Sequence, residues 1–455
     1  MMTHLLKTLL LAVVLVVVGG CGSGPAPDAG KNEGTPPLGD RALTIAWAEW
    51  VPSRVLKEMA DEWGKNNNVE IRTAFYQWPK YQEKVYAAFA SKSAAYDIIV
   101  GDSQWLGKGA VEGHYLELTD FLKKENLTAD IEPAALRAFC EYPPYSEQYY
   151  AAPCEMDACG WAYRKDLFED AKEKEAFKGK YNRELAVPKT WQELRDIAEF
   201  FTRPDQKLYG VAMFTDCGQY DAVTMGFEQV MWAWGAAYCD KDFKVEGVLN
   251  SKKGVEALEF YKELATKFMP PDSGNYYHRE CLNAYMSGQV AMMTNFFALM
   301  PPLTDAKQCK YAAQTGYFAM PAGPGGEAFA SLGGQGMSVS RYAQPRKQEL
   351  AKKFIKWFLQ TDNQKKWASH CGCFSASVSA YKDLSVRGAA PFNTAFTDSL
   401  PLLRDFYNTP EYAELLESCQ KHWNAAIIGK ETPKEAMDAI AKEHTEILKK
   451  AGALK

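Results

Sequence analysis

The sequence predicts an α/β fold in which mainly parallel sheets are flanked by helices, with a helical region at the C-terminal end. Three observations lead to this prediction. Short apolar runs alternate with helical patterns between residues 41 and 100. The alternation returns after Thr190, and the last part of the chain has helical spacing with Thr432 as a cap. Strands that alternate with helices are typical of parallel sheets covered by helices.

The first stretch contains three predicted strands separated by two predicted helices. Apolar residues in the helical segments recur three or four positions apart, which indicates one buried face for each helix. The third strand is stopped by Gly101-Asp102-Ser103. The predicted strands cover 43–47, 69–75 and 96–100, and the predicted helices cover 51–64 and 79–91.

A second series of strands and helices occupies the middle of the chain. Thr190 is predicted as the N-cap of a helix, because Glu193 stands three residues on and completes a capping box. We find no internal repeat in the sequence. The further strands cover 209–214 and 290–294, and the further helices cover 190–202, 222–237, 251–268, 277–287 and 348–360.

The first forty residues differ from the rest of the chain. Residues 1–20 have a short positive start, an apolar run from 9 to 18 and small residues at the end, which is typical of a secretory signal peptide. Val18-Gly19-Gly20-Cys21 resembles a bacterial lipobox, and this resemblance implies a lipid on Cys21 that anchors the protein to a membrane. The alternative is an ordinary cleaved signal with an incidental cysteine. Residues 21–40 are rich in Gly, Pro and small polar residues, so we expect a flexible tether.

Composition excludes some classes of function. The chain has 57 acidic and 52 basic residues, and 47% of its residues are apolar. A mildly acidic chain without a basic block is a poor nucleic-acid binder, because phosphate contact needs clustered Lys and Arg. The length after residue 41 is sufficient for two or more lobes with sizeable cores.

Cysteine is frequent for a chain of this type. There are 11 cysteines, and ten remain when Cys21 is set aside. An even set in an exported protein indicates disulfides, and Cys154 and Cys159 are close enough in sequence for a local bridge across a turn. A metal site at His370-Cys371-Gly372-Cys373 is the alternative, but it lacks a second nearby ligand pair of the zinc type. We therefore expect neither a metal nor a cofactor.

Five segments carry a resemblance to a known family. In chain order they are 96–103, 161–168, 188–194, 288–292 and 332–340. They are similar to segments of the family 1 extracellular solute-binding proteins of ABC importers, the relatives of maltose-binding protein. Tyr96 stands where the family usually has proline, and Arg164 stands where it has asparagine. Together the segments cover roughly residues 41–365.

The resemblance implies the two-lobed periplasmic binding protein fold of type II, which closes on its ligand by a hinge motion. It places an N-terminal lobe at 41–153 plus 335–372, and a C-terminal lobe at 154–334 plus 373–455. It also implies a monomer that works with ABC transporter permease subunits at an extracytoplasmic membrane face.

Candidate ligand residues follow the first three strands. In an open α/β sheet, ligands bind beyond the carboxyl ends of the parallel strands. Carboxylates and amides there would contact sugar hydroxyls, and indoles would pack on sugar C–H faces. The alternatives are core packing for the tryptophans and helix capping for Asp102. The candidates are Glu49, Trp50, Trp78, Asp102, Ser103 and Trp105.

Candidates in the second predicted lobe come partly from the resemblance. Glu155 and Asp157 stand two apart and share one face if the segment is extended. Of Trp232 and Trp234, the family pattern favours Trp232, with core packing as the alternative. The remaining candidates are Asn295 and Phe296 after a buried strand, and Gly334 and Gln335 at a predicted crossing between the lobes.

These observations predict a receptor for a carbohydrate or polyol and not an enzyme. One alternative is a secreted carbohydrate-active enzyme with a carboxylate pair such as Glu155 with Asp157, or Glu49 with Asp102. The other is a binding protein for a non-sugar solute. The sequence contains no Gly-x-Ser-x-Gly or His-Glu-x-x-His motif.

Overall fold

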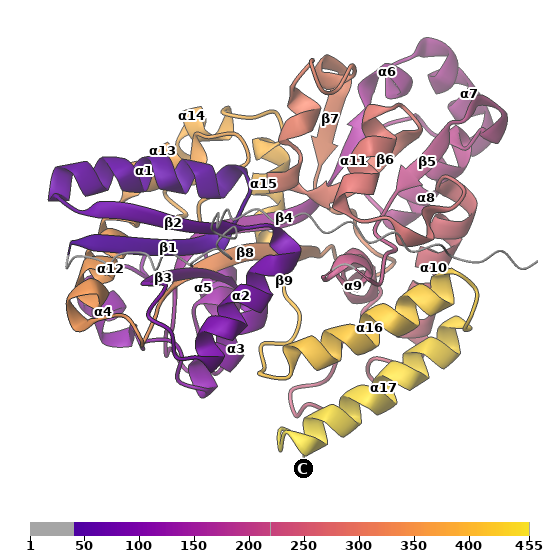
Figure 1. Cartoon of the computed structure of the whole chain (residues 1–455). Coiled ribbons are helices and arrows are strands. Elements are labelled where there is room, and N and C mark those ends of the chain that lie inside the picture. Colours follow the sequence, from indigo (N-terminus) through magenta and orange to yellow (C-terminus); the bar gives the residue numbers. More distant parts are fainter. Residues whose placement is uncertain (1–40, 219, 455) are drawn as a thin grey trace, which may run out of the picture. The chain divides into compact units, whose positions relative to one another are not determined.

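The computed structural model describes residues 41–218 and 220–454. The predicted signal peptide at 1–20, the tether at 21–40 and the lipidation site Cys21 lie outside the described residues. The α/β fold class is confirmed, and Figure 1 shows strands covered by helices along the described chain.

The first predicted strands form a parallel sheet. Strand β1 (Ala42–Ala48) lies between β2 (Glu70–Tyr76) and β3 (Ile98–Asp102), and it is parallel to both. Helices α1 (Val51–Asn67) and α2 (Trp78–Ala90) connect these strands. β1 is buried along its whole length, so its apolar residues contribute to the core.

Two long strands connect this sheet to a second one. β8 (Ala330–Val339) is antiparallel to β3, and β4 (Ala152–Arg164) is antiparallel to β8. β4 pairs with β8 up to Ala158, and from Cys159 onward it pairs with strands of the second sheet. A single strand thus passes from one sheet to the other without a loop.

The second sheet is built around the far end of β4. β6 (Val290–Phe296) and β7 (Thr315–Phe318) are antiparallel to β4, and β5 (Tyr209–Ala212) is parallel to β6. The strand order along the whole path is β2-β1-β3-β8-β4-β6-β5. A short strand, β9 (Leu403–Arg404), pairs with the start of β8.

The predicted capping boxes are present. Thr190 caps α8 (Trp191–Phe201): its hydroxyl accepts from the Glu193 N–H at 3.1 Å, and Glu193 accepts from the Thr190 N–H at 3.3 Å. Thr432 caps α17 in the same way, with Glu435 as its partner. In both cases two backbone groups at a helix start are satisfied reciprocally.

The C-terminal helices pack on helices of the second sheet. α16 (Tyr412–Ile427) lies against α9 (Ala222–Ala233) and α10 (Lys252–Phe268), and α17 (Pro433–Lys450) lies against α10 and α16. Figure 1 shows this pair in yellow below α9 and α10. Trp423 and Phe227 meet edge to face in this contact, with ring centroids 4.7 Å apart.

Shorter helices complete the described chain. None of the described helices is long and apolar enough to cross a membrane. The remaining helices are α3 (Ser103–Val111), α4 (Thr119–Lys124), α5 (Pro133–Phe139), α6 (Lys165–Phe168), α7 (Ala171–Tyr181), α11 (His278–Met286), α12 (Pro345–Phe358), α13 (Thr361–Ala368), α14 (Leu384–Arg387) and α15 (Asn393–Ser399).

The expected local disulfide between Cys154 and Cys159 is wrong. Both residues lie on the continuous strand β4, and both are free thiols. Five residues of a strand span about 16 Å, whereas bridged Cα atoms lie about 4.4–6.8 Å apart. The ten described cysteines are all free. A local bridge requires a turn between the two cysteines, and the structure has a strand there.

Candidate functional site

The strand ends bring several predicted residues to one edge of the sheet. The pairing of β3 with β8 places Asp102 opposite Gln335, and the pairing of β8 with β4 places Gln335 opposite Glu155. Residues opposite each other on neighbouring strands point to the same face. Asp102, Gln335 and Glu155 therefore form one polar row across three adjacent strands.

Two of the predicted tryptophans lie beside each other at this edge. Trp50 and Trp78 are both half-buried, with ring centroids 5.9 Å apart. Trp50 also meets the buried Trp47 edge to face at 5.6 Å. Glu49 is exposed next to them and accepts a hydrogen bond from Gln77 at 2.9 Å. Two half-buried indoles and an exposed carboxylate therefore adjoin at this edge.

Trp105 and Trp232 are placed in the core. Trp105 is 1% exposed and meets Tyr81 edge to face at 5.0 Å. Trp232 is 3% exposed and packs near Tyr238 and Phe329. Both indoles are therefore packed in the core, which is the alternative given for the tryptophans in the sequence analysis.

Asp102 occupies the N-cap position of α3 without capping it. Its side chain makes no cap hydrogen bond and accepts instead from the Ser103 hydroxyl at 3.2 Å. Tyr220 and Gln335 also lie beside the carboxylate, and burial raises the pKa of Asp102 to about 6. The carboxylate thus bonds to side chains at this edge of the sheet and not to the start of α3.

The opposite wall of the site is made by residues that sequence reasoning missed. Asp221, the N-cap residue of α9, accepts hydrogen bonds from the Gln104 side-chain amide at 3.3 Å and from the Tyr277 hydroxyl. Tyr220 meets Trp78, with ring centroids 5.7 Å apart. Asp221 and Tyr220 follow β5, so the strand-end rule applied to the second sheet would have found this segment.

Glu155 and Asp157 are buried and bind backbone amides. Glu155 accepts from the Phe374 N–H at 3.0 Å, and Asp157 accepts from the Ala158 N–H at 2.8 Å and the Ala298 N–H at 3.1 Å. Burial raises the pKa of Asp157 to about 8, and burial together with Asp157 raises the pKa of Glu155. Both acids tie the crossing strand β4 to other segments.

The remaining candidates have packing roles. Asn295 donates to the His278 carbonyl at 2.9 Å and accepts from the Phe296 N–H, so it fixes the start of α11. Phe296 packs near Phe214. Gly334 has φ of 142°, and a Cβ there would lie 2.5 Å from the Glu155 carbonyl oxygen. The close approach of β8 to β4 therefore requires glycine at this position.

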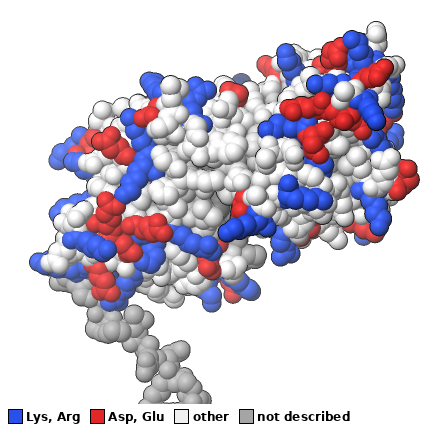
Figure 2. Space-filling model, turned by 90° about the horizontal axis from the view of Figure 1, so that it is seen from above, with Lys and Arg blue, Asp and Glu red and all other residues white. Residues whose placement is uncertain are grey.

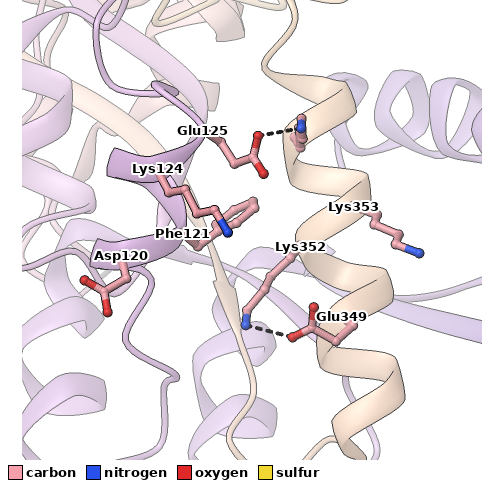
Figure 3. Close-up of a pocket in the computed structure, with 8 residues that line it drawn as sticks. Asp120, Phe121, Lys124, Glu125, Glu349, Lys352 and Lys353 are labelled. Carbon is pink, nitrogen blue, oxygen red and sulfur yellow. Dashed lines mark hydrogen bonds and ion pairs between the residues drawn. The ribbon is translucent and has the colours of Figure 1, made fainter.

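A separate surface groove lies between α4 and α12. Its volume is about 430 Å³, and Figure 3 shows its charged side chains. Lys356 pairs with Glu125, and Lys352 pairs with Glu349 at 2.9 Å. Phe121 is the one aromatic residue that lines the groove, so the groove lacks the adjoining indoles of the strand-end site.

The surface seen in Figure 2 has no block of one charge. Basic and acidic residues are interspersed at both ends of this face, and a broad uncharged area lies between them. Among the described residues, no group of three or more His, Cys, Asp and Glu side chains could hold a metal ion.

Comparison with known proteins identifies relatives. A family model described as bacterial extracellular solute-binding protein matches residues 48–365. A "probable ABC transporter-binding protein" of Deinococcus radiodurans is 26% identical over 344 residues, which is 74% of this chain and 76% of that protein. A mannitol-binding protein of Pseudomonas aeruginosa is 24% identical over 323 residues, 67% of this chain and 70% of that protein.

One solved structure has the same fold over most of the chain. It is an ABC transporter solute-binding protein of Agrobacterium radiobacter in complex with ribitol. The TM-score is 0.76 at 26% identity, and the alignment covers 90% of this chain and 100% of that one. This similarity and the family match confirm the resemblance and the type II fold expected from the sequence.

Proposed function

Because the chain belongs to the bacterial extracellular solute-binding protein family, we propose that it captures a carbohydrate or polyol and delivers it to the permease of an ABC importer. The observation that carries this proposal is the polar row of Asp102, Gln335 and Glu155 beside the half-buried Trp50 and Trp78. Hydroxyl groups match the row and C–H faces match the indoles. A mannitol-binding relative and a ribitol-bound relative support a ligand of this class.

The proposed lobes are residues 41–153 plus 335–372 and residues 154–334 plus 373–455. The packing of α16 and α17 on α9 and α10 supports the assignment of the C-terminal helices to the second lobe. Ligand binding would favour a closed form to the extent that the ligand binds this form more tightly. The proposed anchor is a lipid on Cys21, followed by the tether, which would hold a monomeric receptor near its permease.

The carboxylate-pair enzyme is less well supported than the receptor. Glu155 and Asp157 are both engaged by backbone amides in the crossing strand. A glycosidase needs one acid and one base or nucleophile that face the scissile bond across about 5–10 Å. Glu49 is exposed and bonded to Gln77, and Asp102 accepts from the Ser103 hydroxyl.

A thermal-shift screen of the purified chain against sugars, polyols and amino acids tests the proposal. A ligand that binds only the folded state adds about 2.7 kcal/mol at a hundredfold excess over Kd. We expect a shift with a sugar or polyol, and recovery of this compound chemically unchanged.

Two variants make the test specific to the site. Trp50→Ala removes an indole of the site and should abolish the shift. Trp234→Ala removes a half-buried indole that packs on Phe260 at 4.6 Å, and it should retain the shift. A shift with amino acids alone, or turnover of a sugar, would refute the proposal.

A further inference from the structure

Three aspartates from distant parts of the chain meet beside the polar row. Asp102 ends β3, Asp221 precedes α9, and Asp405 follows β9. Ser103 donates to Asp102 at 3.2 Å, and its side chain also lies beside Asp405. Burial, together with the nearby charge of Asp102, raises the pKa of both Asp221 and Asp405 to about 7.

No basic side chain neutralises this cluster. Within residues 41–218 and 220–454, none of the three carboxylates forms an ion pair with Lys, Arg or His. Arg404 is next to Asp405 in sequence, but its guanidinium lies over the rings of Phe329 at 4.5 Å and Trp232 at 5.8 Å. Three acids at one place without a cation are mutually repulsive when ionised.

A buried acceptor atom beside the cluster provides an independent observation. Gln335 is 5% exposed and its side chain reaches Asp102, yet in the described structure its Oε1 has no hydrogen-bond donor. A buried acceptor without a donor is costly, so a ligand that donates to this atom is favoured here.

One chemical group meets all these requirements. A protonated amine has three donors and no acceptor, and it carries the positive charge that the carboxylates lack. A hydroxyl has one donor and no charge.

We propose that the ligand carries a protonated amine, as in an amino sugar or an amino polyol, and that its ammonium group binds among Asp102, Asp221 and Asp405. This inference rests on the proposed function, since it assumes a carbohydrate-like ligand in this site. The hydroxyls of the same ligand would contact Gln335 and the row beyond it, and its C–H faces would pack on Trp50 and Trp78.

Calorimetric titration of the full chain with matched pairs of compounds tests the inference. Glucosamine is compared with glucose, and 1-amino-1-deoxysorbitol with sorbitol, so that each pair differs by one ammonium in place of one hydroxyl. N-acetylglucosamine tests size without charge. We expect the amine of at least one pair to bind ten times more tightly or better, and the preference to decrease as salt is added.

Variants assign the preference to the cluster. Asp221→Asn should reduce the preference for the amine at least fivefold, and Asp405→Asn provides a second test if the first variant does not fold. Asp398→Asn changes an exposed aspartate on α15 and should leave the preference unchanged.

The outcomes separate the inference from the function on which it rests. If the neutral compound binds as tightly as its amine in both pairs, the inference is overturned and the proposed function stays in place. Failure of every sugar, polyol and amine to bind overturns the proposed function as well. A preference for the amine that persists in both Asp221→Asn and Asp405→Asn overturns the assignment to this cluster.

Discussion

Gln104 donates a hydrogen bond to Asp221, with 3.3 Å between Nε2 and Oδ2, although the two residues are 117 positions apart in sequence. Gln104 belongs to the first turn of α3, and Asp221 precedes α9. The bond therefore connects the segment after β3 of the first sheet with the segment between β5 of the second sheet and α9. In the proposed assignment it joins the two lobes.

Gln104→Glu should weaken ligand binding. The substitution keeps the size of the side chain but replaces a donor with a carboxylate beside Asp221, and like charges at this distance repel. We expect the Kd for the ligand to rise about tenfold, which corresponds to about 1.4 kcal/mol. Calorimetric titration measures this change. Gln104→Ala loses only one hydrogen bond and should have a smaller effect, so equal effects of the two variants would exclude repulsion as the cause.

Asp157→Asn should change how stability depends on pH. The pKa of Asp157 is about 8 in the folded chain and 3.8 for an unperturbed aspartate. Between pH 4 and 8 the folded state thus binds the proton and the unfolded state has lost it. The contribution of Asp157 to the free energy of unfolding is therefore fully present below about pH 4. It is lost as pH rises toward the folded pKa, and the free energy of unfolding falls by about 1.4 kcal/mol per pH unit.

Asparagine cannot titrate, so this part of the slope should disappear in the variant. Urea unfolding at pH 5, 6, 7 and 8 measures it. Asp221 and Asp405 also have raised pKa values, and a shallower slope should remain. Asp398→Asn is the control. Parallel curves for the wild type and Asp157→Asn would show that Asp157 is ionised in the folded chain.

Gly334→Ala should destabilise the chain by about 3 kcal/mol. The φ of 142° disfavours any other residue, and the new Cβ would lie 2.5 Å from the Glu155 carbonyl oxygen. Gly325→Ala is the matched control, because a Cβ at Gly325 meets nothing within 4 Å. Chemical denaturation compares them. Equal stability of the two variants would mean that β8 can move away from β4 at little cost.

Trp105→Ala and Trp78→Ala should affect different properties. Trp105 is in the core, and its loss should cost about 3–5 kcal/mol of stability. Trp78 is half-buried between Trp50 and Tyr220, so its loss should cost less stability and more ligand affinity. Denaturation and titration on both variants measure the two effects. A large loss of stability in Trp78→Ala would place its indole in the core.

Much of the fold was predictable because its signals are local. The capping box of Thr190 and Glu193 involves residues three positions apart, and the buried strand β3 is a continuous apolar run. The family resemblance then extended these local predictions to the type II architecture.

The site was predictable only in part, because it depends on contacts between distant segments. The strand-end rule found Asp102 and Trp50 in the first sheet but was not applied after β5, and Asp221 was therefore missed. Whether an indole is buried depends on the helices packed over it, so Trp105 and Trp50 could not be distinguished by position. Cys154 and Cys159 were misjudged because a turn was assumed where the chain is extended.

The course of β4 also limits how the chain can move. Between Ala158 and Cys159 this strand leaves one set of hydrogen-bonded partners and joins another with no intervening loop. Any rotation of one sheet against the other must twist this stretch of extended backbone. The twisted strand would resist the rotation, so the force that restores the original orientation would come from the backbone of β4 itself.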